Sequence, residues 1–215
     1  MLKTIVANNK PEILVITPLY TGHKVSKETK KTIKRTKTPY TWITYMGKNN
    51  PCKNTQIAFD MYRRNNDLPK YVIKIDNDII AQRGMIDIMY DTLERSMTHE
   101  VYAYCTFEFQ GSIKAKFPAI KFDKERLQKS NYISSCSLIK VNKFLEVGMW
   151  VTDDKGFRLL DWALWLKFLN RGYVGIPTNK ETSFIAIASE NSVSARDSND
   201  YHEKHKWVVD NFISS

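Results

Sequence analysis

The chain has 215 residues and a mass of 25.1 kDa, enough for one domain with a full core but too short for a second domain of ordinary size. Its content of 42% hydrophobic and 12% aromatic residues excludes an intrinsically disordered protein. No apolar run reaches about 18 residues, and residues 1–10 lack a signal-peptide core, so neither a membrane-spanning helix nor secretion is expected. The net charge of +10 favours an anionic partner.

The cysteines indicate a reducing environment. Cys52, Cys105 and Cys136 are odd in number and far apart, so they fit neither a disulfide framework nor a zinc site. We therefore expect a cytoplasmic protein. No histidine lies near Cys136 in the sequence, and a buried thiol is the better interpretation than a nucleophile.

The first half of the chain alternates strands and helices. Hydrophobic periodicity predicts strands at 12–17, 41–46, 71–75 and 101–109, and helices at 26–37, 54–65 and 84–96. The expected buried face of the second helix consists of Ile57, Ala58, Met61 and Tyr62. This alternation predicts an α/β fold of three layers around a mostly parallel central sheet.

The first predicted helix carries a concentration of positive charge. Ser26 is a candidate N-cap, and Val25, Thr29, Ile33 and Thr36 form a thin apolar stripe at helical spacing. One interpretation is a solvated helix face. The other is a binding surface for an anionic acceptor such as a nucleic acid, a phosphate-containing polymer or a membrane-surface glycan. The cations of this segment, named here the basic segment, are Lys24, Lys27, Lys30, Lys31, Lys34, Arg35 and Lys37.

Two acidic residues follow the third predicted strand directly. The apolar run that starts at Tyr71 ends in Asp76-Asn77-Asp78, and ligands of open α/β sheets gather at the carboxyl ends of strands. Two carboxylates there are stabilised by a divalent cation, which prefers oxygen ligands. Alternatively, they are solvated loop residues with Asn77 in a turn.

The second half is less regular. Residues 110–131 predict an exposed, acceptor-side loop, and Val141–Gly148 a short helix closed by glycine. The chain becomes polar after Pro177; we expect residues 189–194 to be mobile and a last helix at 201–212 to dock through Trp207, Val208 and Phe212. We therefore expect a single domain over residues 1–215 with a polar C-terminal segment, residues 178–215.

Asp161 stands out in a segment that is otherwise apolar almost all the way round. Residues 159–172 predict a buried helix that ends at Gly172. An acid in the first turn gains from the helix dipole, which is one explanation for Asp161. The other is a partly desolvated carboxylate that serves as a general base.

The order of these motifs resembles family 2 glycosyltransferases of the GT-A fold, over roughly residues 12–178. The strand Ile13–Tyr20 is similar to the family's opening strand and its proline-tyrosine turn, and Asp76-Asn77-Asp78 to its DXD motif. The segment Leu160–Lys167, with Arg171-Gly172-Tyr173 after it, is similar to the family's acid-Asp-Trp helix and its closing glycine-tyrosine. Residues 134–148 resemble the acceptor-side strand and its neighbouring helix.

The resemblance implies a role for each matching residue. Thr17, Pro18 and Tyr20 would lie on the nucleotide-sugar donor, with Pro18 and Tyr20 lining the base. Lys53 and Asn54 would face the donor as well. Asp76 would contact the ribose or the metal, Asn77 would lie on the donor, and Asp78 would hold Mn²⁺ or Mg²⁺ on the diphosphate. Asp161 would be the catalytic base of a metal-dependent, inverting sugar transfer to an acceptor hydroxyl.

The sequence departs from the family pattern at three places. The second strand, Trp42–Gly47, does not end in the usual pair of acids that grip the base. Leu160 replaces the glutamate that usually precedes the helix aspartate. The histidine that often completes the metal shell has no clear counterpart; Glu190, His202 and His205 are the candidates near that place.

Two rival functions come from other classes. A sugar-phosphate nucleotidyltransferase shares the sheet architecture, but its Gly-rich phosphate loop is reduced to Gly22 in residues 17–24. A noncatalytic nucleic-acid-binding domain would explain the basic segment but not the carboxylates.

Overall fold

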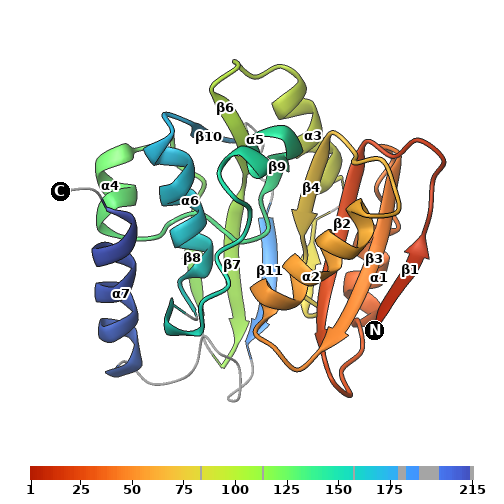
Figure 1. Ribbon diagram of the computed structural model, residues 1–215, viewed down its shortest axis with the longest axis horizontal. Coiled ribbons are helices and arrows are strands. Elements are labelled where there is room, and N and C mark those ends of the chain that lie inside the picture. The colour runs from red at the N-terminus through yellow and green to blue at the C-terminus, as the bar shows by residue number, and fades with distance from the viewer. Residues whose placement is uncertain (83, 113, 157, 179–182, 189–198, 214–215) are drawn as a thin grey trace.

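The computed structural model describes residues 1–82, 84–112, 114–156, 158–178, 183–188 and 199–213. In these ranges a central sheet carries helices on both faces, and a smaller sheet lies beside it (Figure 1). Within the same ranges every helix is too short or too polar to serve as a bilayer-spanning segment.

The central sheet has strands of one dominant direction. In spatial order they are β1 (Leu2–Val6), β3 (Tyr40–Gly47), β2 (Ile13–Tyr20), β4 (Tyr71–Lys74), β9 (Leu138–Lys140), β6 (Glu100–Tyr104) and β10 (Val174–Pro177). β2 pairs in parallel with β3 and β4, and β6 with β10, whereas β9 is antiparallel to β4 and β6 and β1 is antiparallel to β3. β2, β3, β4, β6 and β10 therefore share one direction, which confirms the mostly parallel sheet.

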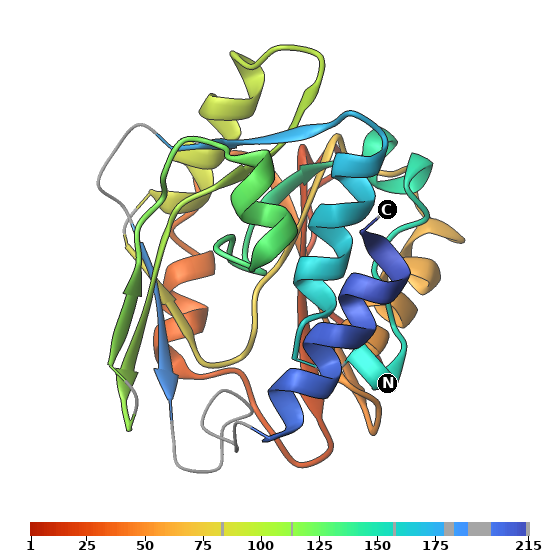
Figure 2. The same ribbon diagram turned by 90° about the vertical axis from the view of Figure 1, so that its left-hand side faces the viewer.

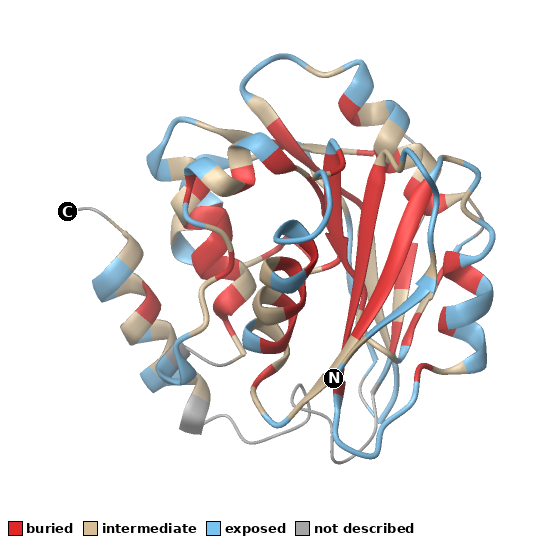
Figure 3. Cartoon of the chain, turned by 45° about the vertical axis from the view of Figure 1, so that its right-hand side comes forward, coloured by how far each residue is buried: buried red, intermediate tan, exposed pale blue. Residues whose placement is uncertain are grey.

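The alternation of strand side chains divides the core into two halves. Along β2, Leu14 and Ile16 belong to one cluster of buried residues, and Ile13 and Val15 to the other. All four are fully buried (Figure 3). A strand buried on both faces is a continuous hydrophobic run, which explains why this segment is so apolar.

Helices cover both faces. They are α1 (Lys27–Ile33), α2 (Pro51–Arg63), α3 (Met85–Glu94), α4 (Lys124–Lys129), α5 (Val141–Glu146), α6 (Leu160–Asn170) and α7 (Asn199–Phe212), with a 3₁₀ turn, η1 (Asp154–Gly156). α2, α5 and α6 contribute to the core cluster that contains Leu14, and α1 and α3 to the cluster that contains Ile13. The predicted three-layer α/β architecture is confirmed.

The smaller sheet shows that the predicted strand 101–109 was wrong. The chain leaves the central sheet at Cys105 and enters a second sheet of order β5 (Ile79–Ala81), β11 (Ser183–Ala188), β7 (Thr106–Gly111) and β8 (Ala115–Phe117). Figure 2 shows this sheet beside the main body. The apolar pattern continues unbroken through residues 101–109, so it cannot reveal that β6 pairs with β9 and β7 with β11.

Several predicted boundaries also move. The helix expected at 54–65 begins at Pro51, because the side chain of Asn50 caps it by accepting a hydrogen bond from Lys53 N at 2.8 Å. Its buried face is rotated from the expected one, and Met61 is 37% exposed. The helix expected at 26–37 ends at Ile33, although Ser26 caps it as predicted.

The C-terminal half contains more regular structure than expected. The loop expected at 110–131 includes β8 and α4, and the segment expected to be polar from residue 178 includes β11. Residues 189–194 lie outside the described ranges. α7 docks through Val208, which is fully buried, and through the partly buried Trp207 and Phe212.

Candidate active site

The predicted site lies at the carboxyl ends of β2, β3 and β4. β4 pairs with β2 only as far as Lys74 opposite Ile16, whereas β2 continues beside β3 to Tyr20. Pro18 therefore sits where β2 has already lost one of its two neighbours, a position that tolerates a missing N–H group. The turn after β4 places Asp76, Asn77 and Asp78 at this edge of the sheet, as expected from the sequence.

A buried lysine accompanies the two aspartates. The Lys74 ammonium lies 2.6 Å from Asp76 Oδ2, and the lysine is only 5% exposed. Burial lowers the pKa of Lys74, but the Asp76 carboxylate outweighs it and holds the pKa above its ordinary value. Lys74 therefore carries a positive charge inside the protein, directly below the carboxylate edge.

Asp78 and Asn77 differ in their surroundings. The Asp78 side chain reaches solvent, yet desolvation by the surrounding protein and repulsion from Asp76 raise its pKa. A cation bound at this turn would relieve that repulsion. Asn77 has a structural function: its carbonyl accepts hydrogen bonds from Ser26 N and Thr29 Oγ1, each at 3.0 Å. The turn is thereby fixed to the first turn of α1.

Asp161 lies in the first turn of α6, within electrostatic reach of Lys74. Its Oδ2 accepts a hydrogen bond from Asn131 Nδ2 at 3.0 Å, and its Oδ1 accepts one from Trp162 N at 2.9 Å. Burial raises the pKa of Asp161 to about 6, although these bonds and the nearby Lys74 charge act in the opposite direction. A carboxylate with a pKa close to neutrality suits proton abstraction from a hydroxyl group.

Two tryptophans of α6 fix the helix that presents Asp161. Trp162 Nε1 donates to Leu127 O at 2.6 Å, and Trp165 Nε1 donates to Ile133 O at 3.2 Å. Both side chains are almost completely buried, and their N–H groups are satisfied by these carbonyls. α4, through Leu127, and the segment before β9, through Ile133, are thus held against the first half of α6.

The residues expected on the donor differ in accessibility. Thr17 is fully buried, and its Oγ1 accepts a hydrogen bond from Trp42 Nε1 at 3.1 Å. Pro18 is also buried, whereas Tyr20 is 36% exposed, with its ring 6.0 Å from that of His23. Of these, Tyr20 has the most surface to offer a nucleotide base. Their contact with a donor stays a prediction.

Lys53 and Asn54 lie in the first turn of α2, at the start of the helix. The Lys53 side chain is exposed. Asn54 is fully buried, and its Nδ2 donates to Asn49 O at 3.0 Å and to Leu19 O at 3.4 Å. Asn54 therefore ties the end of β2 to the loop before α2, and its predicted contact with the donor stays a prediction.

The donor set fits a cation that is shared with phosphate. Among the described residues, no group of three or more His, Cys, Asp or Glu side chains could enclose a metal ion. His205 lies against Trp162 and the carbonyl of Lys129, and His202 is exposed beside Tyr201, while Glu190 lies outside the described ranges. Mg²⁺ and similar ions commonly use one or two carboxylates plus substrate phosphates, which Asp76 and Asp78 allow.

The basic segment forms an exposed surface next to the turn. All seven cations, Lys24 to Lys37, are exposed. Val25, Thr29 and Ile33 of the predicted apolar stripe are buried, whereas Thr36 lies beyond the end of α1 and is only partly buried. Thr29 Oγ1 also donates to Ile79 O at 2.8 Å, which anchors α1 on β5. The positive surface and the carboxylate turn are thus parts of one rigid unit.

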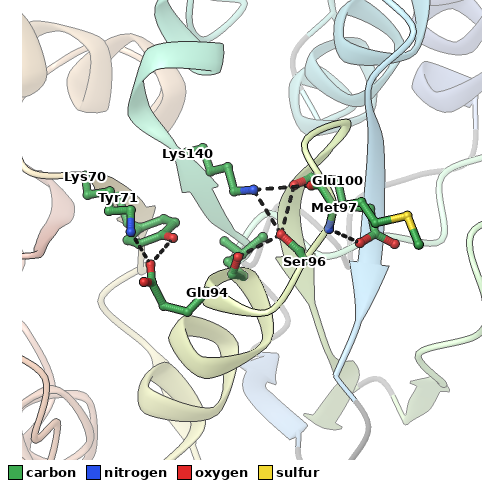
Figure 4. A network of polar contacts seen from close by, with 8 residues as sticks. Lys70, Tyr71, Glu94, Ser96, Met97, Glu100 and Lys140 are labelled. Carbon is green, nitrogen blue, oxygen red and sulfur yellow. Dashed lines mark hydrogen bonds and ion pairs between the residues drawn. The ribbon is translucent and has the colours of Figure 1, made fainter.

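A cavity of about 660 Å³ lies at the opposite end of β4 and is not the candidate site. Its lysines already have partners (Figure 4): Lys70 Nζ lies 2.5 Å from Glu94 Oε1, which also accepts a hydrogen bond from Tyr71, and Lys140 Nζ donates to Ser96 Oγ at 2.9 Å. Lys70 is paired with a carboxylate and Lys140 is hydrogen-bonded to a hydroxyl group, so this network explains both lysines without a ligand.

Comparison with known proteins supports the fold. No family model and no curated protein sequence matches the chain. Solved structures do match. S. aureus TarS 1–349 in complex with UDP-GlcNAc is 12% identical at a TM-score of 0.65, covering 95% of this chain and 68% of that one. The catalytic domain of Drosophila β1,4-galactosyltransferase 7, in complex with xylobiose, is 10% identical at a TM-score of 0.60. The match covers 89% of this chain and 78% of that one.

A third match carries a metal. The mannosyltransferase PcManGT from Pyrobaculum calidifontis, in complex with GDP-Man and Mn²⁺, is 12% identical at a TM-score of 0.52, covering 90% of this chain and 62% of that one. The chain has a glycosyltransferase fold of the GT-A type. In this GT-A fold the carboxyl edge described above contains Asp76, Asp78 and Asp161.

Sequence reasoning missed two residues of the site. Lys74 interrupts a run of Val and Ile in a fully buried strand, and that interruption was the available signal. Asn131, which donates a hydrogen bond to Asp161, lies in a polar loop, and nothing in the sequence marked it as a site residue. The two residues are 30 positions apart and meet only in the folded chain.

Proposed function

We propose that this protein is a glycosyltransferase that moves a sugar from a nucleotide-sugar donor to an acceptor hydroxyl with inversion. The observation that carries the proposal is the position of Asp161, whose pKa is about 6, within electrostatic reach of Lys74 and the carboxylate turn in a GT-A fold. A base and a candidate diphosphate site thus occupy one edge of the sheet.

The mechanism is a single displacement. Asp161 accepts the proton of the acceptor hydroxyl while that oxygen forms a bond to the anomeric carbon of the donor. The bond between the anomeric carbon and the diphosphate oxygen breaks, and its electron pair leaves with the diphosphate. Asn131 holds Asp161 Oδ2 at 3.0 Å and so orients the carboxylate. General base catalysis contributes typically about 10²–10⁴-fold.

Asp78, with Asp76, would hold a divalent cation on the diphosphate. Such a cation, Mn²⁺ or Mg²⁺, would neutralise the charge that develops on the leaving group. Asp78 is the more accessible of the two, because Asp76 is paired with Lys74. Metal dependence is supported by this donor set and by the Mn²⁺ complex of the similar mannosyltransferase.

The acceptor in this proposal is anionic. The exposed basic segment lies on the helix that is bound to the carboxylate turn, and a donor diphosphate alone does not need seven cations. An acceptor that carries phosphate or other negative groups would be attracted to this surface. The comparisons give no support to a nucleic acid acceptor.

The test is an assay of donor hydrolysis and sugar transfer with a panel of nucleotide sugars, with and without Mn²⁺. We expect turnover of at least one donor that requires the cation and is lost in Asp78→Ala. Mn²⁺-dependent binding of the corresponding nucleoside diphosphate should also be lost in Asp78→Ala, with an unchanged circular dichroism spectrum. Formation of a nucleotide sugar from a sugar phosphate would instead indicate a nucleotidyltransferase, and unchanged diphosphate affinity would remove Asp78 from the metal site.

A further inference from the structure

Lys74 is a charged residue in a fully buried strand, which is unusual for a residue with a purely structural role. It lies at the end of β4 between Ile73 and Ile75, opposite the buried Ile16 of β2. An ammonium group in such surroundings is costly unless it is paired, and an apolar side chain of similar size is usually at least as stabilising. The position therefore calls for a functional explanation.

The charges around Lys74 supply one. Its ammonium contacts the Asp76 carboxylate at 2.6 Å, and its charge is also felt by Asp161, Cys52 and Cys136. Burial raises the pKa of each of these cysteines to about 12, so neither contributes a negative charge. Lys74 thus cancels one of the two negative charges that the turn presents through Asp76 and Asp78.

One uncompensated carboxylate is a poor site for a free divalent cation. A donor diphosphate would supply the missing negative charge and oxygen ligands. We infer that Lys74 is a positioning residue that holds Asp76 in an ion pair and thereby makes cation binding depend on the donor diphosphate. The inference rests on the metal use in the proposed function. It adds an order of binding: the cation binds together with the nucleotide and not to the free protein.

The test measures binding of Mn²⁺ alone, without donor or acceptor, by electron paramagnetic resonance or calorimetry. Lys74→Met removes the charge and keeps the chain length, so Mn²⁺ should bind at least about tenfold more tightly than to the wild type. Lys74→Arg keeps the charge and should bind Mn²⁺ as weakly as the wild type does. Thermal unfolding of Lys74→Met should change little, because the Asp76 side chain is 28% exposed and can turn to water.

Further variants keep the result interpretable. Lys74→Gln replaces Lys74→Met if the latter does not fold, and Asp78→Ala in the Lys74→Met background should abolish the gain. Equal Mn²⁺ affinity in the wild type and both uncharged variants would overturn the inference, as would no measurable binding in any of them. A gain in Mn²⁺ affinity together with no turnover of any nucleotide sugar would leave the inference standing and remove the proposed function.

Discussion

In the proposed mechanism, Asp161 is the residue that accepts the proton of the acceptor hydroxyl. It must be ionised to accept a proton, and it must be partly desolvated to hold a pKa near neutrality. The start of α6 satisfies both requirements, because its other side chains are buried while Asp161 lies at the margin of the core. The two predictions at this scale separate its catalytic effect from its effect on stability.

The first prediction is that Asp161→Asn lowers turnover by about 10²-fold or more. Asparagine has nearly the same shape, and its carbonyl can still accept the hydrogen bond from Asn131, but it cannot take a proton. Donor affinity should change little, because Asp161 would act on the acceptor. In the wild type, kcat/KM should fall as the pH drops below about 6. Near-wild-type turnover in a folded variant would reduce Asp161 to a residue of helix initiation.

The same substitution should stabilise the protein at high pH. The pKa of Asp161 is about 6 in the folded state and about 4 in an unfolded chain, so the folded state binds the proton more tightly. Its contribution to stability is present below about pH 4 and is lost as the pH rises through 6. Asp161→Asn should therefore gain up to about 2–3 kcal/mol at pH 8 and nothing at pH 4, measured by thermal unfolding. Equal gains at both pH values would contradict a raised pKa.

Single residues show where sequence reasoning succeeds. Asp78 and Asp161 are acids that interrupt apolar surroundings, so each was visible from the sequence alone. Asn131 is a polar residue in a polar loop, and its position is decided by the tryptophan contacts of α6. The buried role of Asn54 was equally hidden, because it depends on how β3 and α2 approach each other: a Cβ atom on Gly47 would lie 2.4 Å from Asn54 Oδ1.

At the scale of secondary structure elements, α1 has a buried inner side and a basic outer side. Its inner side, Thr29 and Ile33, is buried against the small sheet and the core, and its outer side carries the basic segment. Amphipathic spacing in the sequence was enough to predict this division. The length of α1 was not predictable, since the chain beyond Ile33 stays polar and helix-compatible until Thr38 and Pro39.

We predict that replacing Lys30, Lys31, Lys34 and Arg35 with glutamine weakens acceptor binding by roughly tenfold or more at low salt and flattens its salt dependence. All four are exposed, so the fold should survive. The matched control replaces four exposed cations outside the basic segment, namely Lys3, Lys10, Arg64 and Arg95. The measurement is affinity for an anionic acceptor against ionic strength. Equal salt slopes in the two variants would show that the basic segment is only a solvated surface.

The elements also mark the limit of pattern analysis. The strands β2, β3 and β4 and the helices α1, α2 and α3 were found because each buries a strong apolar pattern, whereas the mostly exposed β1 was missed. β5 and β8 have only three residues each, too few for a period to show, and β7 continues the pattern of β6 without a break. Membership in one sheet or the other is decided by pairing partners far away in the chain, such as β11 for β7.

On the scale of the whole molecule, α7 packs against α6. Figures 1 and 2 both show the two helices next to each other, and the ring of His205 lies 4.8 Å from that of Trp162. The C-terminal helix therefore supports the helix that presents Asp161. Its docking was predictable from its apolar residues, but the surface that receives it was not.

We predict that Val208→Asp destabilises the protein by about 3 kcal/mol, because it places an unpaired charge at a fully buried position. The matched control is Asn211→Asp, which adds the same charge at an exposed position of α7. Thermal unfolding and limited proteolysis of α7 are the measurements. Similar melting temperatures for the two variants would mean that α7 is not docked as described.

The carbonyl of Asn77 has a thermodynamic consequence. It belongs to the turn between Asp76 and Asp78 and also receives the first N–H and hydroxyl groups of α1. A cation at the turn and an acceptor on the basic segment would therefore both act on the hydrogen bonds of this one carbonyl. If occupancy of either shifts this carbonyl, linkage requires reciprocity: the factor by which the cation changes acceptor affinity equals the factor by which the acceptor changes cation affinity. If that factor is greater than one, a cation at the turn would be held more tightly when the acceptor is bound, and if it is less than one, less tightly.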